Sequence, residues 1–213
     1  MHKAIIWDMD GVILDSELFY DEVRRDLAAQ FGLTLNIEHL KQFRGRNEPF
    51  YEVISKHHGN TLDFEDFFIK YHEILEEFYS HRIPLAEHVH ETLRALGAKF
   101  PMALATNTNR SCVNRVFERY KLSPYFQSIF TGDDVVRRKP DPEIFLKAAA
   151  ALGVEPEACI VIEDSEAGFR AATGAGMRLI ARKTPDNLHQ DFSPAEYTIE
   201  QLSEIPELLN SLA

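Results

Sequence analysis

Short apolar runs recur along the chain, and segments with helical spacing lie between them. The runs are apolar throughout instead of alternating, which is typical of strands buried on both faces. They are Ala4–Trp7, Met102–Thr106, Ser128–Thr131, Cys159–Ile162 and Arg178–Ala181. Helices are predicted over Ser111–Lys121, Pro142–Leu152 and Ser165–Ala175, with stops at Gly153 and Gly176. This order predicts an α/β fold with a Rossmann-like, mostly parallel sheet covered by helices on both faces.

The stretch from about Asp15 to Arg82 interrupts this alternation. It contains no convincing strand, and its aromatic and leucine residues follow the i, i+3, i+4, i+7 spacing of an amphipathic helix: Phe64, Phe67, Phe68, Tyr71, Leu75 and Phe78. We interpret this stripe as the core between helices. The prediction is a core domain of residues 1–14 and 83–213 with an inserted helical cap of residues 15–82. Ligands of open parallel sheets bind outside the carboxyl ends of the strands, so an insert after the first strand is expected to act as a lid.

Composition and charge narrow the function classes. The 213 residues suffice for one core with a smaller insert, and 45% hydrophobic with 27% charged residues is ordinary for a globular protein. The formal net charge of −11 argues against a nucleic-acid partner. The same charge repels small anionic substrates unless a metal ion or local lysines and arginines reverse the field in one cleft.

Cysteines and hydropathy indicate the compartment. Cys112 and Cys159 are too few for a disulfide framework, and we expect both to be reduced and packed. The apolar run after Lys3 is interrupted by Asp8, so it is no secretion signal, and no later segment predicts a membrane span. The expectation is a cytoplasmic protein with no membrane partner, which we treat as a monomer.

Polar residues gather where the predicted strands end. Taken singly, each fits a turn or a helix cap, or a solvated charge in the case of Lys139. Their joint occurrence in this order favours a site: Asp8 and Asp10 follow the first strand, Thr106 and Asn107 end the second, Glu163 and Asp164 follow the fourth, and Lys139 precedes a helix.

These residue types suit phosphoryl transfer through a carboxylate. Oxygen ligands from Asp8, Asp10 and either Glu163 or Asp164 are what Mg²⁺ prefers, and the cation would relieve the repulsion between them. Aspartate carboxylates also serve as covalent nucleophiles in some phosphoryl-transfer enzymes. Thr106, Asn107 and main-chain N–H groups are expected to hold phosphate oxygens, while Lys139 supplies positive charge.

Four motifs carry a family resemblance. They are Asp8-Met-Asp-Gly-Val-Ile-Leu-Asp-Ser16, Ala103-Leu-Ala-Thr-Asn107, Lys139-Pro-Asp-Pro-Glu-Ile-Phe145 and Val161-Ile-Glu-Asp-Ser-Glu-Ala-Gly168. In this order they resemble the haloacid dehalogenase-like (HAD) hydrolase superfamily, in the branch of β-phosphoglucomutase and related sugar-phosphate phosphatases. The resemblance implies a Rossmann-like core with a helical cap.

The resemblance also implies roles for single residues. Asp8 matches the nucleophile and a Mg²⁺ ligand, and Asp10 matches the general acid/base whose main-chain carbonyl binds the metal. Thr106 and Lys139 match the phosphate-binding and charge-neutralising positions. Asp164 matches the acidic Mg²⁺ ligand, with Glu163 ligating directly or through water.

Substrate choice is expected to depend on the insert. Arg44 and Arg46 lie where related caps lower a specificity loop, and they are candidates for gripping the substrate; two solvated arginines near a helix end are the alternative. The histidines, His57-His58 and His88-x-His90 among them, lack an accompanying ligand set and are expected at the surface. Tyr20 stands where β-phosphoglucomutases carry a histidine associated with mutase chemistry; simple packing of the first insert helix is its other interpretation.

The sequence as a whole predicts a Mg²⁺-dependent phosphatase that hydrolyses a small phosphorylated metabolite, such as a sugar phosphate, through an aspartyl-phosphate. Two alternatives stay open: a phosphomutase of the β-phosphoglucomutase type, and a catalytically silent phosphate-binding module with a regulatory role.

Overall fold

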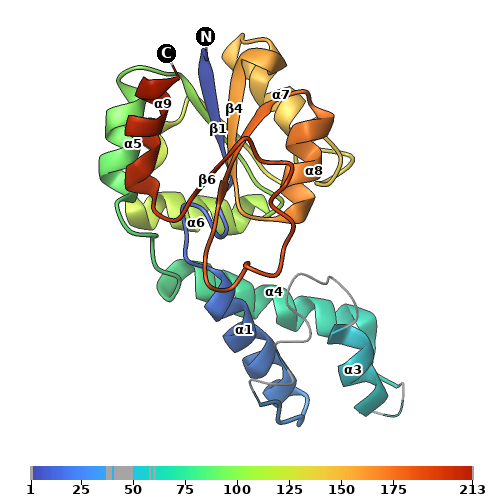
Figure 1. Cartoon of the computed structure of the whole chain (residues 1–213). Coiled ribbons are helices and arrows are strands. Elements are labelled where there is room, and N and C mark those ends of the chain that lie inside the picture. The colour runs from blue at the N-terminus through green and yellow to red at the C-terminus, as the bar shows by residue number, and fades with distance from the viewer. Residues whose placement is uncertain (1, 37–39, 41–49, 58, 60, 213) are drawn as a thin grey trace. The chain divides into compact units, whose positions relative to one another are not determined.

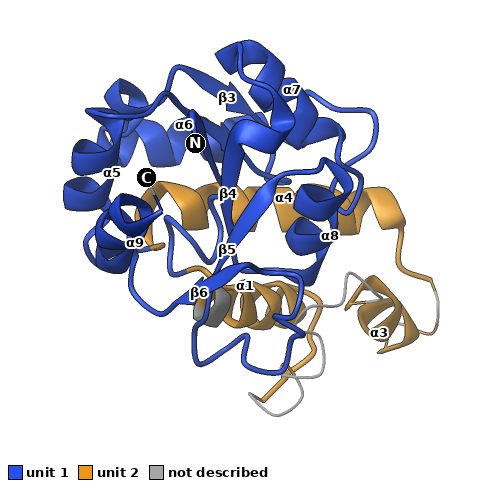
Figure 2. Ribbon diagram, turned by 45° about the horizontal axis from the view of Figure 1, so that its top comes forward, with its two compact units in different colours: residues 1–15, 84–213 blue, residues 16–83 orange. Residues whose placement is uncertain are grey.

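The chain folds into two compact units. The computed structural model describes residues 2–36, 40, 50–57, 59 and 61–212. One unit comprises Met1–Asp15 with Pro84–Ala213, and the other comprises Ser16–Ile83 (Figure 2). The predicted insert, residues 15–82, begins and ends one residue earlier than this smaller unit.

The larger unit is built on a six-stranded parallel sheet, which confirms the predicted α/β class. The strand order is β3-β2-β1-β4-β5-β6. The strands are β1 (Ala4–Trp7), β2 (Met102–Ala105), β3 (Ser128–Phe130), β4 (Cys159–Glu163), β5 (Arg178–Arg182) and β6 (Tyr197–Ile199). The first five lie where the apolar runs predicted them, with ends that differ by one residue at most. The sequence analysis did not predict β6, a three-residue edge strand.

Helices cover both faces of this sheet. They are α5 (Val89–Gly97), α6 (Arg110–Tyr120), α7 (Glu143–Leu152), α8 (Glu166–Gly174) and α9 (Ile205–Ser211), with short 3₁₀ turns at Ser123–Tyr125, Pro156–Ala158 and Leu202–Glu204. In both overall views, α7 and α8 lie on one side of the sheet and α5 and α9 on the other (Figure 1). The predicted helices α6, α7 and α8 are confirmed, whereas α5 and α9 were not anticipated.

The uninterrupted apolar character of the strands follows from this two-sided burial. Alternate strand residues, such as Ile6, Ala103, Val161 and Leu179, join α7 and α8 in one buried cluster. Side chains alternate between the two faces along a strand, so the residues between them point to the opposite face. There the indole N–H of Trp7 lies 3.3 Å from Sδ of Met102. Both faces therefore demand apolar residues.

The strand order reverses between β1 and β4. The chain builds β1, β2 and β3 in one direction and then returns to add β4 on the other side of β1. Register pairs Trp7 with Leu104 on one side and with Ile162 on the other. Ligands of open α/β sheets bind at such a reversal point, outside the carboxyl ends of the strands. The loops after β1 and β4 are therefore the place to look for a site.

The smaller unit contains α1 (Glu17–Gln30), α3 (Phe50–His57) and α4 (Phe64–His81). Phe78 of α4 packs against Phe19 of α1, with ring centroids 5.4 Å apart. The predicted aromatic stripe divides in two: Phe67, Leu75 and Phe78 are buried, whereas Phe64 and Phe68 are 57% and 48% exposed. The helix predicted from the stripe is confirmed as α4, but only part of the stripe forms core.

The cysteines and the lengths of the helices bear on two further expectations. Neither Cys112 nor Cys159 forms a disulfide and both are buried, as expected for packed thiols. In the part of the chain that the structure describes, no helix is both long enough and apolar enough to cross a membrane.

Candidate active site

Asp8 directly follows β1, at the reversal point between β1 and β4. Its main-chain N–H donates to the carbonyl of Ile162 at 3.0 Å, which continues the pairing with β4 for one residue beyond the strand. A turn held by the carbonyl of Met9 follows, with N–H donors from Ile13 and Leu14 at 2.9 Å. The apolar strand thus carries the buried Asp8 carboxylate to the sheet edge, and the turn presents Asp10.

Gly11 is required at this turn for two reasons. Its φ of +73° lies in the left-handed region that side chains rarely adopt. A Cβ at this position would also lie 2.0 Å from Oδ2 of Asp164, so the close approach of the β1 and β4 loops needs a residue without a side chain. The glycine after Asp10 therefore lets the acidic groups of the two loops come together.

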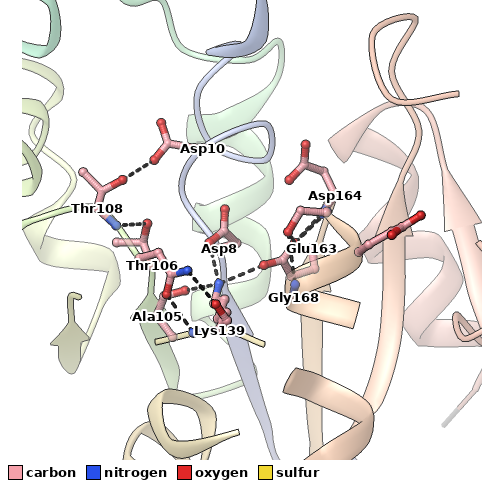
Figure 3. A network of polar contacts seen from close by, with 12 residues as sticks. Asp8, Asp10, Ala105, Thr106, Thr108, Lys139, Glu163, Asp164 and Gly168 are labelled. Atoms are coloured by element: carbon pink, nitrogen blue, oxygen red, sulfur yellow. Dashed lines mark hydrogen bonds and ion pairs between the residues drawn. The ribbon is translucent and has the colours of Figure 1, made fainter. Parts of the chain in front are cut away.

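Lys139 ties these loops together. Its Nζ donates to Oδ1 of Asp8 at 2.6 Å, to Oε1 of Glu163 at 2.8 Å and to the carbonyl of Ala105 at 2.8 Å (Figure 3). The ammonium also lies 4.7 Å from the ring centroid of Phe145, a cation–π contact. Three acceptors match the three N–H groups of an ammonium, so the buried charge is fully hydrogen-bonded.

The same contacts set the protonation of Asp8 and Lys139. Burial raises the pKa of Asp8 well above the usual range; the Lys139 ammonium opposes this rise, and the Glu163 and Asp10 carboxylates add to it. Burial lowers the pKa of Lys139, but the Asp8 and Glu163 carboxylates outweigh it, so its pKa lies above the ordinary value. Lys139 therefore stays charged and is the cation that opposes protonation of Asp8.

Glu163 has a supporting position. While Oε1 faces Lys139, Oε2 accepts from the N–H of Asp164 at 2.7 Å and from the N–H and hydroxyl of Ser165 at 2.8 and 3.0 Å. A Cβ on Gly168 would lie 1.8 Å from Oε1 of Glu163, so this glycine makes room for the carboxylate. Glu163 thus links Lys139 to the start of α8.

Three carboxylates form a group suited to a cation. One oxygen from each of Asp8, Glu163 and Asp164 lies within 4.8 Å of the other two, and all three residues are buried. Among the described residues, no other group of three or more acidic, histidine or cysteine side chains lies close enough together to hold a metal ion. Of the histidines named in the sequence analysis, His57 and His88 are exposed and His90 is half-buried, in line with their expected surface role.

Thr106 and Thr108 join the end of β2 to the acidic loops. Thr106, 1% exposed, donates its N–H to the carbonyl of Phe130 at 3.1 Å, and its hydroxyl accepts from the N–H of Thr108 at 3.2 Å. The hydroxyl of Thr108 donates to Oδ2 of Asp10 at 2.5 Å (Figure 3). Sequence analysis overlooked Thr108, although it is the third polar residue in the run that ends this strand.

Asn107 lies beside this group, with both ends of its amide engaged by protein. Its Nδ2 donates to the carbonyl of Lys139 at 3.2 Å, and its Oδ1 accepts from the N–H of Lys139 at 3.0 Å. The predicted phosphate-binding candidate therefore contacts the main chain of another predicted site residue.

Two further residues that support the site had no recognisable signal in the sequence. Nδ2 of Asn187, in the loop after β5, donates to the carbonyl of Asp164 at 3.0 Å and to that of Arg182 at 2.9 Å. Nη1 of Arg182 donates to the carbonyl of Gly11 at 3.0 Å and to the Asp15 carboxylate at 2.9 Å. Together they hold the main chain of the loops that follow β1 and β4. Neither belongs to a motif.

The two arginine candidates, Arg44 and Arg46, lie outside the described residues. Tyr20 is described: its hydroxyl lies 2.5 Å from that of Tyr79, a residue of α4 that is 1% exposed. This pairing between helices of the smaller unit agrees with the packing interpretation of Tyr20.

Comparison with known proteins agrees with this arrangement. The sequence profile of the haloacid dehalogenase-like hydrolase family matches residues 5–182, which include every predicted site residue. The chain therefore belongs to this hydrolase family, as its motifs predicted.

Relatives with known names are similar over most of their length. The chain is 28% identical to 6-phosphogluconate phosphatase of Escherichia coli, over 97% of this chain and 94% of that protein. It is 34% identical to a phosphorylated carbohydrates phosphatase of Thermotoga maritima, over 84% and 83% respectively. Among solved structures, a Thermotoga maritima protein named provisionally as a β-phosphoglucomutase superposes with a TM-score of 0.83 at 29% identity, covering 99% of this chain and 100% of that one.

Proposed function

We propose that this HAD-like hydrolase is a Mg²⁺-dependent phosphatase that removes the phosphoryl group from a small sugar phosphate through an aspartyl-phosphate on Asp8. The observation that carries the proposal is the Lys139 ammonium, which contacts the Asp8 and Glu163 carboxylates at once within a buried acidic group. The named relatives, which act on phosphorylated carbohydrates, support the same substrate class.

The donor set fits Mg²⁺. Three buried carboxylates lie close together and one ammonium contacts two of them, so a cation is needed to balance the charge in a site of low dielectric. Carboxylate oxygens are hard ligands of the kind that Mg²⁺ takes. We assign Asp8 and Asp164 as carboxylate ligands and, by family resemblance, Asp10 through its carbonyl. Glu163 is assigned to a water-mediated position, because both its oxygens already accept hydrogen bonds. When bound, the ion supplies electrostatic stabilisation of phosphoryl oxygens and of the entering carboxylate.

The first half-reaction transfers the phosphoryl group to the enzyme. An oxygen of the Asp8 carboxylate attacks phosphorus, and the ester bond between phosphorus and the sugar oxygen breaks. Protonated Asp10 gives its proton to the leaving oxygen, so a neutral alcohol departs. The Thr106 hydroxyl binds a phosphoryl oxygen, and Lys139 offsets the negative charge on Asp8.

The second half-reaction returns the enzyme to its starting state. The Asp10 carboxylate takes a proton from a water molecule as that water attacks phosphorus. The bond between phosphorus and the Asp8 oxygen breaks, inorganic phosphate leaves, and Asp10 is protonated again. Thr108, whose hydroxyl donates to Oδ2 of Asp10, holds this carboxyl group through both steps.

We also propose that the Ser16–Ile83 unit is the substrate-selecting cap. It begins six residues after Asp10, and its insertion point directly follows the loop that carries the nucleophile. Arg44 and Arg46 belong to it and stay candidates for substrate contact. A cytoplasmic location and a monomeric state stay predictions.

The alternative of a phosphomutase is less favoured by Tyr20. A phenol has an ordinary pKa of about 10, so it does not exchange protons in the range of the histidine that β-phosphoglucomutases carry there. The Tyr20 hydroxyl is also paired with Tyr79. The silent regulatory module is less favoured because acid/base, nucleophile and metal positions all hold suitable residues.

The test is a phosphate-release assay over a panel of sugar phosphates, phosphorylated sugar acids, nucleotides and pyrophosphate, with Mg²⁺ or with EDTA. Release from sugar phosphates that requires Mg²⁺ supports the proposal. Absence of release from every member of the panel, by folded protein with Mg²⁺ present, contradicts it.

A further inference from the structure

Asn107 makes a reciprocal pair of hydrogen bonds with the main chain of Lys139. One bond runs from its Nδ2 to the Lys139 carbonyl, at 3.2 Å, and the other from the Lys139 N–H to its Oδ1, at 3.0 Å. A side-chain amide offers a donor and an acceptor side by side, so it can pair with both groups of one residue. These two bonds fix the position of the Lys139 main chain, from which the side chain extends.

The last residue of β2 also contacts the ammonium of Lys139. The carbonyl of Ala105, two residues before Asn107, accepts from Nζ of Lys139 at 2.8 Å. One short segment therefore contacts the lysine at its main chain and at its ammonium. The side chain between these points is directed to Asp8 and Glu163.

The segment that carries Asn107 is itself held in register. Thr106 donates its N–H to Phe130, and the N–H of Gly132 donates to the carbonyl of Thr108, both at 3.1 Å. A Cβ on Gly132 would lie 2.4 Å from the carbonyl oxygen of Asn107, so the two chains pass very close here. A fixed main chain makes Asn107 a rigid support for Lys139.

We propose that Asn107 is a positioning residue for Lys139 and not a ligand of the phosphoryl group, in contrast to its sequence-based assignment. The kinetic test of this inference rests on the proposed function, because it measures phosphatase activity. Loss of the Asn107 side chain leaves the N–H and carbonyl of Lys139 without these partners and lets the loop shift, so the ammonium no longer meets Asp8 in the geometry that catalysis needs.

The kinetic test compares Asn107→Ala with Asn109→Ala. Asn109 lies two residues away and caps α6, with its side chain accepting from the N–H of Cys112 at 2.9 Å, so its loss costs stability without touching Lys139. We expect Asn107→Ala to lower kcat about 10- to 100-fold, the range for two lost hydrogen bonds, with KM and inhibition by inorganic phosphate changed less than about twofold. Asn109→Ala should keep kcat within about twofold.

An independent test measures amide hydrogen exchange of Lys139 by NMR. In Asn107→Ala the Lys139 amide should exchange about 3- to 10-fold faster, because its acceptor is gone, while the amide of Cys112 is unchanged; Asn109→Ala should show the reverse. An unchanged Lys139 amide overturns the inference. So does a variant whose kcat is normal but whose KM and phosphate inhibition constant both rise, since that is the behaviour of a phosphate ligand. If the parent protein releases phosphate from no substrate, the proposed function fails, while the exchange measurement still decides whether Asn107 holds Lys139.

Discussion

The Nζ atom of Lys139 lies 2.6 Å from Oδ1 of Asp8, although 131 residues separate them in the chain. Each group compensates for the burial of the other: the carboxylate raises the pKa of the lysine, and the ammonium limits the rise in the pKa of the aspartate. Lys139 therefore favours the carboxylate form of Asp8 at the carboxyl end of β1. A nucleophilic role requires this state.

Asp8→Asn should abolish turnover while the fold is kept, since the amide has the same volume but is no nucleophile and a poor metal ligand. We expect a loss of at least ~10³-fold in kcat, by analogy with other lost nucleophiles. Circular dichroism and thermal unfolding check the fold. Asp66→Asn, which changes an exposed carboxylate in the first turn of α4, is the matched control and should leave kcat unchanged. Activity of Asp8→Asn within about tenfold of the parent would mean that another group attacks.

Asp10→Asn should slow both half-reactions, because one carboxyl group is proposed to donate the proton to the leaving oxygen and to take one from water. General acid/base catalysis contributes typically ~10²–10⁴-fold. Rapid-quench single-turnover experiments measure the two rates separately. Asp10→Asn also loses the carboxylate that accepts a hydrogen bond from Thr108. Thr108→Val removes this bond but keeps the carboxylate, so it controls for misplacement of the Asp10 side chain alone; its kcat should fall about tenfold or less. Equal rates in parent and Asp10→Asn would leave Asp10 with metal binding only.

Tyr20 bears on the fate of the phospho-enzyme. With β-glucose 1-phosphate, Mg²⁺ and a trace of glucose 1,6-bisphosphate, we expect free phosphate to form faster than glucose 6-phosphate, because water is not excluded in favour of a sugar hydroxyl. Tyr20→His tests whether the histidine of β-phosphoglucomutases shifts this ratio toward isomerisation, with Tyr20→Phe as the control for loss of the bond to Tyr79. Isomerisation that outpaces phosphate release in the parent protein would favour the mutase.

Glu143 makes folding stability depend on pH. Hydrogen bonds from Lys147 and from the N–H groups of Val136 and Arg137 lower the pKa of Glu143 from its ordinary value of 4.5 to about 2. A carboxyl with a lowered pKa stabilises the folded state at pH values above about 4.5, and this contribution is lost as the pH falls toward about 2. The free energy of unfolding should thus fall less steeply in Glu143→Gln than in the parent between about pH 5 and about pH 3, as urea titrations measure. Glu118→Gln, an exposed change on α6, controls for net charge; equal slopes in all three proteins would contradict the prediction.

Much of the fold could be predicted because the sheet is buried on both faces. Strands such as Cys159–Glu163 must then be apolar throughout, which marks them clearly in the sequence. The edge strand β6 has an exposed threonine, Thr198, at its centre, so it is not apolar throughout and carries no such mark. The exposed Phe64 and Phe68 of the α4 stripe show the converse limit, since helical spacing alone does not say which aromatic residues become buried.

Some features of the candidate site could likewise be predicted from the sequence, and others could not. That Asp8, Thr106 and Glu163 gather at one end of the sheet could be predicted, because parallel strands bring their carboxyl ends together there. Asn107 and Asn187 act on main-chain groups of Lys139 and Asp164, which lie 32 and 23 residues away along the chain. A bond to a distant main chain places no requirement on the partner's residue type, so no pattern in the sequence reports it.

The stereochemical course at phosphorus tests the central claim most directly. The phosphorothioate analogue of a substrate found in the panel is synthesised with two different oxygen isotopes on phosphorus and hydrolysed in water that carries the third, and the configuration of the chiral thiophosphate released is determined. Attack by Asp8 followed by attack by water inverts the phosphorus twice, so the account predicts overall retention. Overall inversion would show that water attacks the substrate directly, and would contradict an aspartyl-phosphate on Asp8.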